Sequence, residues 1–275
     1  MGKVIIYQML PRLWGNIGGK NIKNGTLKDN GCGKFSSIDT ISLEYLRSLG
    51  VSHVWYTGII RHATAEDSDG CTPSSADWVK GRAGSPYSIT DYYDVNPYLA
   101  DEPENRMEEF HKLVERTHAA GLKVIIDFVP NHVARDYGRF AAAHPAPTGM
   151  AALGESDDKS VHWKDSNDFF YYPGIPLALP IQNQTYMEMP AMASGNSYTS
   201  SPGVNDWYDT IKLNYCDSHT ETWEKMYDIV NFWAGQGVDG FRCDMVELVP
   251  QAFFKWLISR IKKDRPDLLF VAEVY

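Results

Sequence analysis

The chain has 275 residues and a formal net charge of −9, and this length suits one large α/β domain with an insertion. An acidic surface repels phosphate backbones and no run of about 18 apolar residues occurs, so we expect neither a nucleic-acid partner nor a membrane span. The first residues enter a strand pattern without a signal-peptide layout, so we expect a cytoplasmic protein.

The first half of the chain alternates apolar runs with amphipathic stretches. The apolar runs predict β-strands over three segments, residues 4–8, 51–56 and 123–129. The spacing of apolar residues predicts one helix over 39–50, with Asp39 as its N-cap, and another over 104–120. Residues 57–97 are rich in glycine and proline, and we interpret them as irregular.

The second half resumes this alternation after a long interruption. Residues 133–213 hold many Pro, Gly, Ser and Asn and no long period, and we interpret them as an inserted subdomain. The pattern then predicts a helix, a strand, a helix and a strand over 220–236, 238–244, 251–263 and 268–273. This order predicts parallel strands joined by crossover helices, which both an open doubly wound sheet and part of a (β/α)8 barrel satisfy.

Three of the predicted strands end in a carboxylate. Asp244 ends one strand, Glu273 ends the next, and Asp127 lies near the end of an earlier one. These acids favour the barrel, because barrel sites gather at the carboxyl ends of several strands.

Asp244 and Glu273 form a candidate catalytic pair. Cleavage of a glycosidic bond requires two carboxyl groups, one ionised and one protonated. Arg242 lies two residues before Asp244 and therefore on the same face of the strand, where we expect it to hold the Asp244 carboxylate. A structural ion pair at the rim of a sheet is the alternative interpretation.

Asn131 and His132 follow the Asp127 strand directly. A neutral histidine can hydrogen-bond a sugar hydroxyl, and an asparagine carbonyl can do the same or bind calcium. Capping of the loop is the alternative. The aromatic content of 13% suits sugar binding, because aromatic faces stack on sugars, and it suits core packing equally.

Three short motifs give the chain a family resemblance. Asp-Phe-Val-Pro-Asn-His at 127–132, Gly-Phe-Arg-Cys-Asp at 240–244 and Val-Ala-Glu-Val at 271–274 resemble, in order and spacing, consecutive signature regions of the α-amylase family of glycoside hydrolases, family 13. Residues 85–93 and 7–12 resemble further family segments. The resemblance thus covers almost the whole chain.

The resemblance implies a (β/α)8 TIM barrel of the α-amylase type. Only about the first five strands are expected in this chain, with an irregular insertion after the third. Residues 1–132 would form the first part of the barrel, 133–213 the inserted subdomain, and 214–275 the continuation with strands four and five.

The resemblance also implies roles for the strand-end residues. Asp244 would be the nucleophile that forms a covalent glycosyl ester, and Glu273 would be the general acid and then the general base. Arg242 would orient Asp244 and keep it ionised, while Asp127 would brace Arg242. Among the substrate-binding residues, His132 would contact the sugar before the scissile bond.

Tyr87 would stack on that same sugar, and Asn131 matches a position that ligates calcium in many members. Lys212, however, stands where those members have an acid, so we expect no required cofactor, and calcium at Asn131 stays an open alternative. The four cysteines lack the paired spacing of a zinc site. Glu247 and Leu248 stand where many members have Lys-His, so contacts beyond the cleavage point should differ.

The family's later Asn-His-Asp signature does not occur before Tyr275. We therefore expect an N-terminal part of a longer enzyme, completed by the rest of the barrel in the same or another chain.

The expected activity is retaining hydrolysis of α-1,4-glucosidic bonds in starch-like glucans or maltooligosaccharides by double displacement. The alternatives are a transglycosylase or isomerase at the same site, similar to glucanotransferases or trehalose synthases, and a glucan-binding domain without catalysis.

Overall fold

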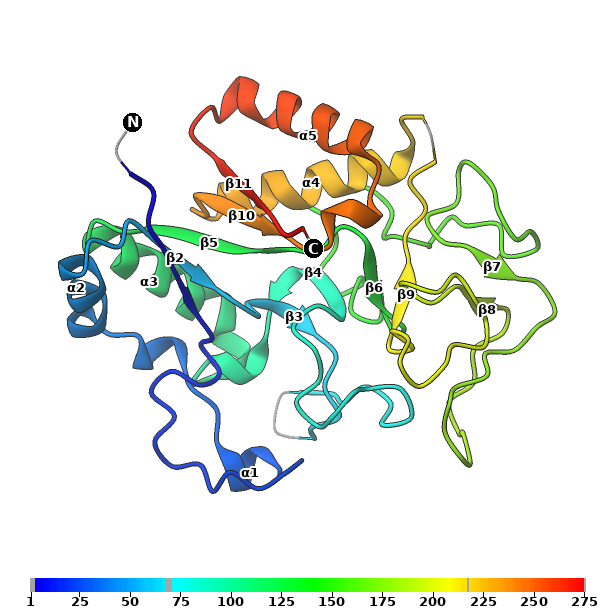
Figure 1. Ribbon diagram of the computed structural model, residues 1–275, viewed down its shortest axis with the longest axis horizontal. Helices are drawn as coiled ribbons and strands as arrows, with labels where there is room; N and C mark the ends of the chain where they lie inside the picture. Colours follow the sequence, from blue (N-terminus) through cyan, green and yellow to red (C-terminus); the bar gives the residue numbers. More distant parts are fainter. Residues whose placement is uncertain (1–2, 68–70, 217, 275) are drawn as a thin grey trace.

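A five-stranded parallel sheet forms the centre of the molecule, in a computed structural model that describes residues 3–67, 71–216 and 218–274 (Figure 1). Its strands lie in the order β1 (Ile6–Met9), β2 (His53–Tyr56), β5 (Lys123–Phe128), β10 (Gly240–Cys243) and β11 (Leu269–Ala272). Each strand lies within two residues of its predicted bounds. The five predicted strands are therefore present and parallel.

The strand order bears on the choice between barrel and doubly wound sheet. The order follows the chain without reversal, whereas a doubly wound sheet reverses its order at a switch point. Sequential order is that of a barrel wall. Within the described residues β1 and β11 remain the two edges of the sheet, so these residues do not close a barrel.

Four helices connect the strands: α2 (Thr40–Ser48), α3 (Arg106–Ala119), α4 (Glu221–Gly235) and α5 (Gln251–Asp264). In Figure 1, α2 and α3 lie beside β2 and β5, while α4 and α5 lie beside β10 and β11. The predicted N-cap is confirmed, because the Asp39 side chain accepts a hydrogen bond from the Ser42 amide at 2.8 Å. Predicted and observed helices thus agree closely.

The two faces of the sheet differ in chemistry because alternate residues of a strand point to opposite sides. One set packs under the helices into a single hydrophobic core, which includes Val54, Ile126, Phe241, Leu113 and Trp233. The other set includes Trp55, Asp127 and Arg242. The polar groups therefore share the face that the helices leave uncovered.

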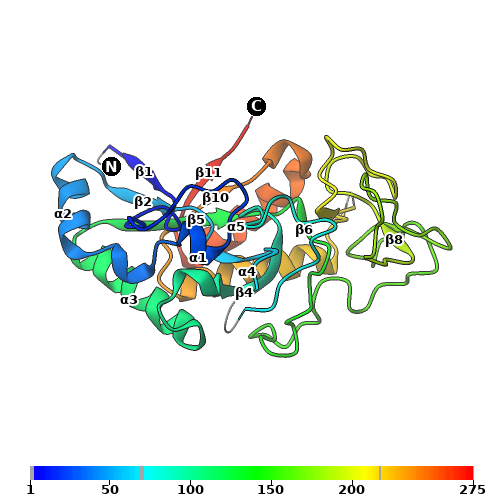
Figure 2. The same cartoon turned by 90° about the horizontal axis from the view of Figure 1, so that it is seen from below.

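Residues 133–213 contain short antiparallel ladders and long irregular stretches. β6 (His132–Ala134) pairs with β9 (Thr210–Lys212), and β7 (Tyr171–Tyr172) pairs with β8 (Ala191–Met192). Figure 2 shows this segment at the end of the molecule opposite α2. The remaining short helices are α1 (Leu27–Asn30), η1 (Phe35–Ser37), η2 (Pro97–Leu99), η3 (Pro103–Asn105) and η4 (Val246–Leu248).

The prediction for residues 57–97 is wrong in one respect. This stretch holds a two-stranded antiparallel sheet of β3 (Ile60–His62) and β4 (Ile89–Val95). The polar residues Asp91 and Asp94 of β4 are buried, which hides the alternation of a strand. No helix among the described residues is both long and apolar enough to cross a membrane.

Candidate active site

The carboxyl ends of β5, β10 and β11 bring four of the predicted residues together. Arg242 pairs in register with Asp127 on β5, and Asp244 and Glu273 directly follow β10 and β11. The ladder continues past the strands, because the Glu273 amide donates to the Cys243 carbonyl at 3.0 Å. Parallel pairing therefore places all three acids at one rim.

Arg242 contacts all three carboxylates. Its Nη1 lies 2.8 Å from Asp244 Oδ1 and 3.4 Å from Asp127 Oδ1, and its Nη2 forms an ion pair with Glu273 Oε1. Asp244 and Glu273 are also close enough that Glu273 raises the pKa of Asp244. The two candidate catalytic acids thus lie side by side on a single guanidinium.

Trp55 and Tyr87 flank this cluster. The Cζ atom of Arg242 lies 5.1 Å from the centroid of each ring, a distance typical of a cation–π contact. Trp55 Nε1 also donates to Asp127 Oδ1 at 3.2 Å, and the Gly58 amide donates to Asp127 Oδ2 at 3.2 Å. Sequence reasoning missed Trp55, although its place near the end of a strand was a usable signal.

Burial controls the acidity of the cluster. Burial raises the pKa of Asp127 to about 6, and the neighbouring Arg242 charge opposes this rise. Burial also raises the pKa of Asp244; Arg242 lowers it, and the adjacent Glu273 raises it again. Arg242 thus favours the ionised form of Asp244, while burial and the adjacent Glu273 oppose it.

His132 lies next to this cluster as a buried, neutral ring. Its Nδ1 lies 3.0 Å from the Asn131 side-chain amide, which donates to it, and the ring also hydrogen-bonds the backbone of Tyr87. Burial lowers the pKa of His132 to about 3, and the Lys212 charge adds to this effect. The ring is thus a hydrogen-bonding group without charge, as the sequence analysis expected of a sugar contact.

Asn131 does not fit a calcium site in this chain. Its Oδ1 accepts a hydrogen bond from the Lys212 ammonium, which also donates to the Leu248 carbonyl at 2.8 Å. Lys212 is only 3% exposed, and burial lowers its pKa to about 7. A cation already contacts the oxygen that calcium would need, so the residues do not fit the metal.

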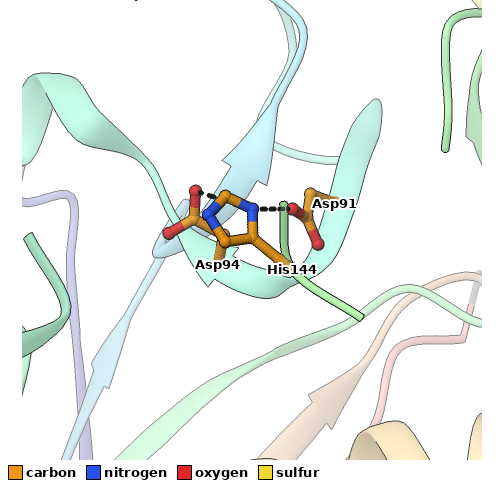
Figure 3. Close-up of side chains that lie close together, drawn as sticks. All are labelled: Asp91, Asp94 and His144. Atoms are coloured by element: carbon orange, nitrogen blue, oxygen red, sulfur yellow. Dashed lines mark hydrogen bonds and ion pairs between the residues drawn. The ribbon is translucent and has the colours of Figure 1, made fainter. Parts of the chain in front are cut away.

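A second acidic group lies on β4 and the insertion. His144 Nδ1 donates to Asp91 Oδ2 at 2.7 Å and lies 3.8 Å from Asp94 Oδ2 (Figure 3). Asp94 already binds two guanidiniums, from Arg61 at 2.9 Å and Arg106 at 2.7 Å. Two guanidinium cations therefore hold this group together as an ion-pair network, and its donor set does not suit a metal.

A hollow of about 850 Å³ lies behind the strand ends. Cys243 and Ala272 line it, and these residues alternate along their strands with the candidate catalytic residues. The hollow therefore opens on the other face of the sheet from Arg242. It is separate from the carboxylate cluster, although the aromatic side chains of Trp163 and Tyr198 also line it.

Comparison with known proteins agrees with the site. The catalytic-domain model of the α-amylase family matches residues 26–267. A cyclomaltodextrin glucanotransferase of Bacillus licheniformis is 27% identical over 237 residues, covering 85% of this chain and 28% of that protein. A trehalose-6-phosphate hydrolase of Bacillus subtilis is 24% identical over 251 residues, which cover 90% of this chain and 35% of that protein. The chain spans about a third of the length of these curated relatives.

Solved structures share the fold. A cyclic α-maltosyl-(1→6)-maltose hydrolase from Arthrobacter globiformis superposes with a TM-score of 0.62 at 19% identity, covering 99% of this chain and 51% of that one. An α-amylase from Lactobacillus plantarum superposes with a TM-score of 0.58 at 23% identity, and the match covers 98% of this chain and 44% of that one. The fold is that of an α-amylase catalytic domain, of the α/β TIM-barrel class. With the family match over most of its length, the chain belongs to the α-amylase family of glycoside hydrolases.

Proposed function

We propose that this chain carries the catalytic acids of a retaining glycoside hydrolase that cleaves α-1,4-glucosidic bonds in starch-like glucans or maltooligosaccharides. The observation that carries the proposal is the convergence of Asp244 and Glu273 on Arg242. Carboxyl groups are about 5–5.5 Å apart in retaining enzymes and about 6.5–9.5 Å apart in inverting ones. Asp244 and Glu273 both contact the single guanidinium of Arg242, which favours the shorter arrangement.

The proposed reaction has two displacements. An oxygen of Asp244 attacks the anomeric carbon while Glu273 gives its proton to the glycosidic oxygen, which leaves with the bonding electrons. A water molecule, deprotonated by Glu273, then attacks the same carbon and releases Asp244.

The surrounding residues orient these groups. Arg242 holds both acids, and Asp127 holds Arg242 from the neighbouring strand. His132 offers a neutral ring to a sugar hydroxyl, and Tyr87 offers an aromatic face beside the cluster. We assign no role to a metal, because the Lys212 ammonium binds the oxygen of Asn131.

We further propose that the sheet is the first part of a (β/α)8 barrel. Residues 1–132 and 214–275 would form the wall, residues 133–213 an inserted subdomain, and the remaining strands would come from the same or another chain. The sequential strand order and the open edges of β1 and β11 support this proposal, as do relatives much longer than this chain.

The test is Asp244→Asn in the whole protein, assayed with maltoheptaose. We expect turnover to fall by several orders of magnitude, because the nucleophile is lost. Asp264→Asn, an exposed substitution at the end of α5, is the matched control and should leave turnover near normal. Near-normal turnover of Asp244→Asn would contradict the proposal.

Transglycosylation is the second candidate, favoured by relatives that are named cyclomaltodextrin glucanotransferases. Hydrolysis and transglycosylation share the first displacement, which forms the glycosyl ester. In transglycosylation a sugar hydroxyl replaces water in the second displacement. Product analysis separates the two: longer or rearranged glucans indicate transfer, and shorter ones indicate hydrolysis. Binding of maltoheptaose without any turnover would instead indicate a glucan-binding domain.

A further inference from the structure

Met245, the residue after Asp244, has an unusual backbone conformation. Its φ of 46° and ψ of 48° lie in the left-handed region, which costs a non-glycine residue about 1–2 kcal/mol. Residues held in such conformations cluster at functional sites, where neighbouring contacts maintain them. The conformation ends β10 abruptly and turns the chain directly after Asp244.

The peptide that leads into this turn carries a backbone donor to Glu273. The Met245 amide donates to Glu273 Oε2 at 3.1 Å, while Glu273 Oε1 pairs with Arg242. Each oxygen of the Glu273 carboxyl group thus has its own donor, and one of these donors comes from the residue next to Asp244. The positive φ of Met245 lets the chain turn directly after this amide, and the far end of the turn is held as well. A residue that avoids a positive φ would therefore have to rotate the peptide between residues 244 and 245, which carries the amide, away from Glu273.

The other end of the turn is also held. The Leu248 amide donates to the Met245 carbonyl at 3.0 Å, and the Leu248 carbonyl accepts from the buried Lys212 ammonium at 2.8 Å. The turn is therefore fixed between β9 and β11. These hydrogen bonds offset the energetic cost of the left-handed conformation.

We infer that Met245 is a positioning residue, whose left-handed backbone fixes the Glu273 carboxyl group relative to Asp244. The inference rests on the proposed function and adds a residue to it. The Met245 side chain has no part in this role, so the tolerance of a substitution depends on how well the new residue adopts a positive φ. Glycine and asparagine adopt it readily, alanine less so, and a β-branched residue hardly at all.

The test compares Met245→Gly, Met245→Asn, Met245→Ala and Met245→Val in the whole protein. Alanine is the matched control for valine, because both shorten the side chain and only valine is β-branched at its Cβ. We expect kcat on maltoheptaose to follow the order Gly and Asn, then Ala, then Val, with valine about tenfold or more below alanine. KM should change far less than kcat.

The choice of substrate separates positioning from general damage. Maltosyl fluoride has a leaving group that needs little protonation, so loss of Glu273 alignment should matter less for it. We compare kcat/KM on this substrate, because it reports the first displacement and leaves out the later step in which Glu273 acts as a base. We expect the kcat/KM values of the valine and alanine variants to stay within about threefold of each other. Equal losses on both substrates, or equal rates for valine and alanine, would overturn the inference. If valine fails to fold in a thermal melt, the order of Gly, Asn and Ala decides.

Glu273→Gln, run in the same assays, distinguishes the two levels of argument. If Glu273→Gln loses maltoheptaose turnover while the Met245 series does not follow the expected order, the positioning role is wrong and the proposed function stands. If Glu273→Gln keeps normal turnover, the proposed function is wrong, and the role of Met245 falls with it.

Discussion

Lys212 provides the sharpest test of how this site is held together. Its buried ammonium binds the Asn131 Oδ1 and the Leu248 carbonyl, which belong to the loops after β5 and β10. We predict that the wild-type protein gains no stability from calcium, because this ammonium already contacts the oxygens that calcium would require. Lys212→Met removes the ammonium and its hydrogen bonds, and Lys212→Asp puts a carboxylate in its place.

The magnitude for Lys212→Met follows from two opposing terms. The fall of the Lys212 pKa from 10.5 to about 7 corresponds to about 5 kcal/mol in favour of the neutral amine, and methionine removes this burden. Methionine also leaves two buried acceptors without a donor, at about 1–3 kcal/mol each. The two acceptors together cost about 2–6 kcal/mol against a gain of about 5 kcal/mol, so we expect the free energy of unfolding to change by between a gain of about 3 and a loss of about 1 kcal/mol.

Lys212→Asp should create a response to calcium that the wild type lacks. The new carboxylate joins two freed carbonyl oxygens, and calcium prefers such oxygen ligands. With a dissociation constant of about 0.1–1 mM, typical of weak sites, 10 mM calcium should add about 1.4–2.7 kcal/mol of stability. For a chain of this size that is a rise in Tm of about 3–10 °C.

Thermal unfolding with 10 mM calcium or with a chelator measures all three proteins. Lys212→Met is the matched control, because it frees the same oxygens without adding a carboxylate. A wild-type Tm that rises with calcium or falls with the chelator would refute the reasoning. So would a calcium response of Lys212→Met equal to that of Lys212→Asp.

Two further predictions concern buried charges outside the carboxylate cluster. Burial lowers the pKa of His62 from 6.5 to about 4, so between these values the unfolded chain binds a proton at His62 that the folded chain does not. His62 should therefore contribute a fall in stability of about 1.4 kcal/mol per pH unit as pH drops through this window, beside the contributions of groups such as His132 and Asp127. In urea titrations at pH 4.5–7, His62→Asn should change the slope by this amount, and an unchanged slope would contradict the assignment. Asp94→Asn should cost about 3–5 kcal/mol, because it leaves the buried guanidiniums of Arg61 and Arg106 uncompensated, whereas a loss below about 1 kcal/mol in the same titrations would show that they find other partners.

The strands and the acids at their ends could be predicted because they depend on local pattern. Apolar runs set the strands, and the parallel order then brings Asp127, Asp244 and Glu273 to one rim whatever the rest of the chain does. The same rule places Arg242 beside Asp244.

The parts that escaped prediction depend on partners distant in sequence. β4 was missed because its acids are buried against distant basic side chains, and a single sequence does not reveal such pairs; Asp94, for example, meets Arg61 across 33 residues. The left-handed turn at Met245 depends on a carboxylate 28 residues further on. A methionine gives no local signal for a positive φ, unlike a glycine.

Charge balance explains why Arg242 alone does not offset the effect of burial on the pKa values of the clustered acids. Three carboxylates share one guanidinium, so full ionisation would leave two uncompensated negative charges on the rim. Burial disfavours the charged form of a carboxyl group, so it raises the pKa values of Asp127 and Asp244 and favours their protonated forms. The proposed reaction needs Asp244 ionised, and the Arg242 charge favours the loss of its proton against the effect of burial. The register of β5, β10 and β11 therefore places three acids around one guanidinium, where they share protons, as a direct consequence of where each strand ends.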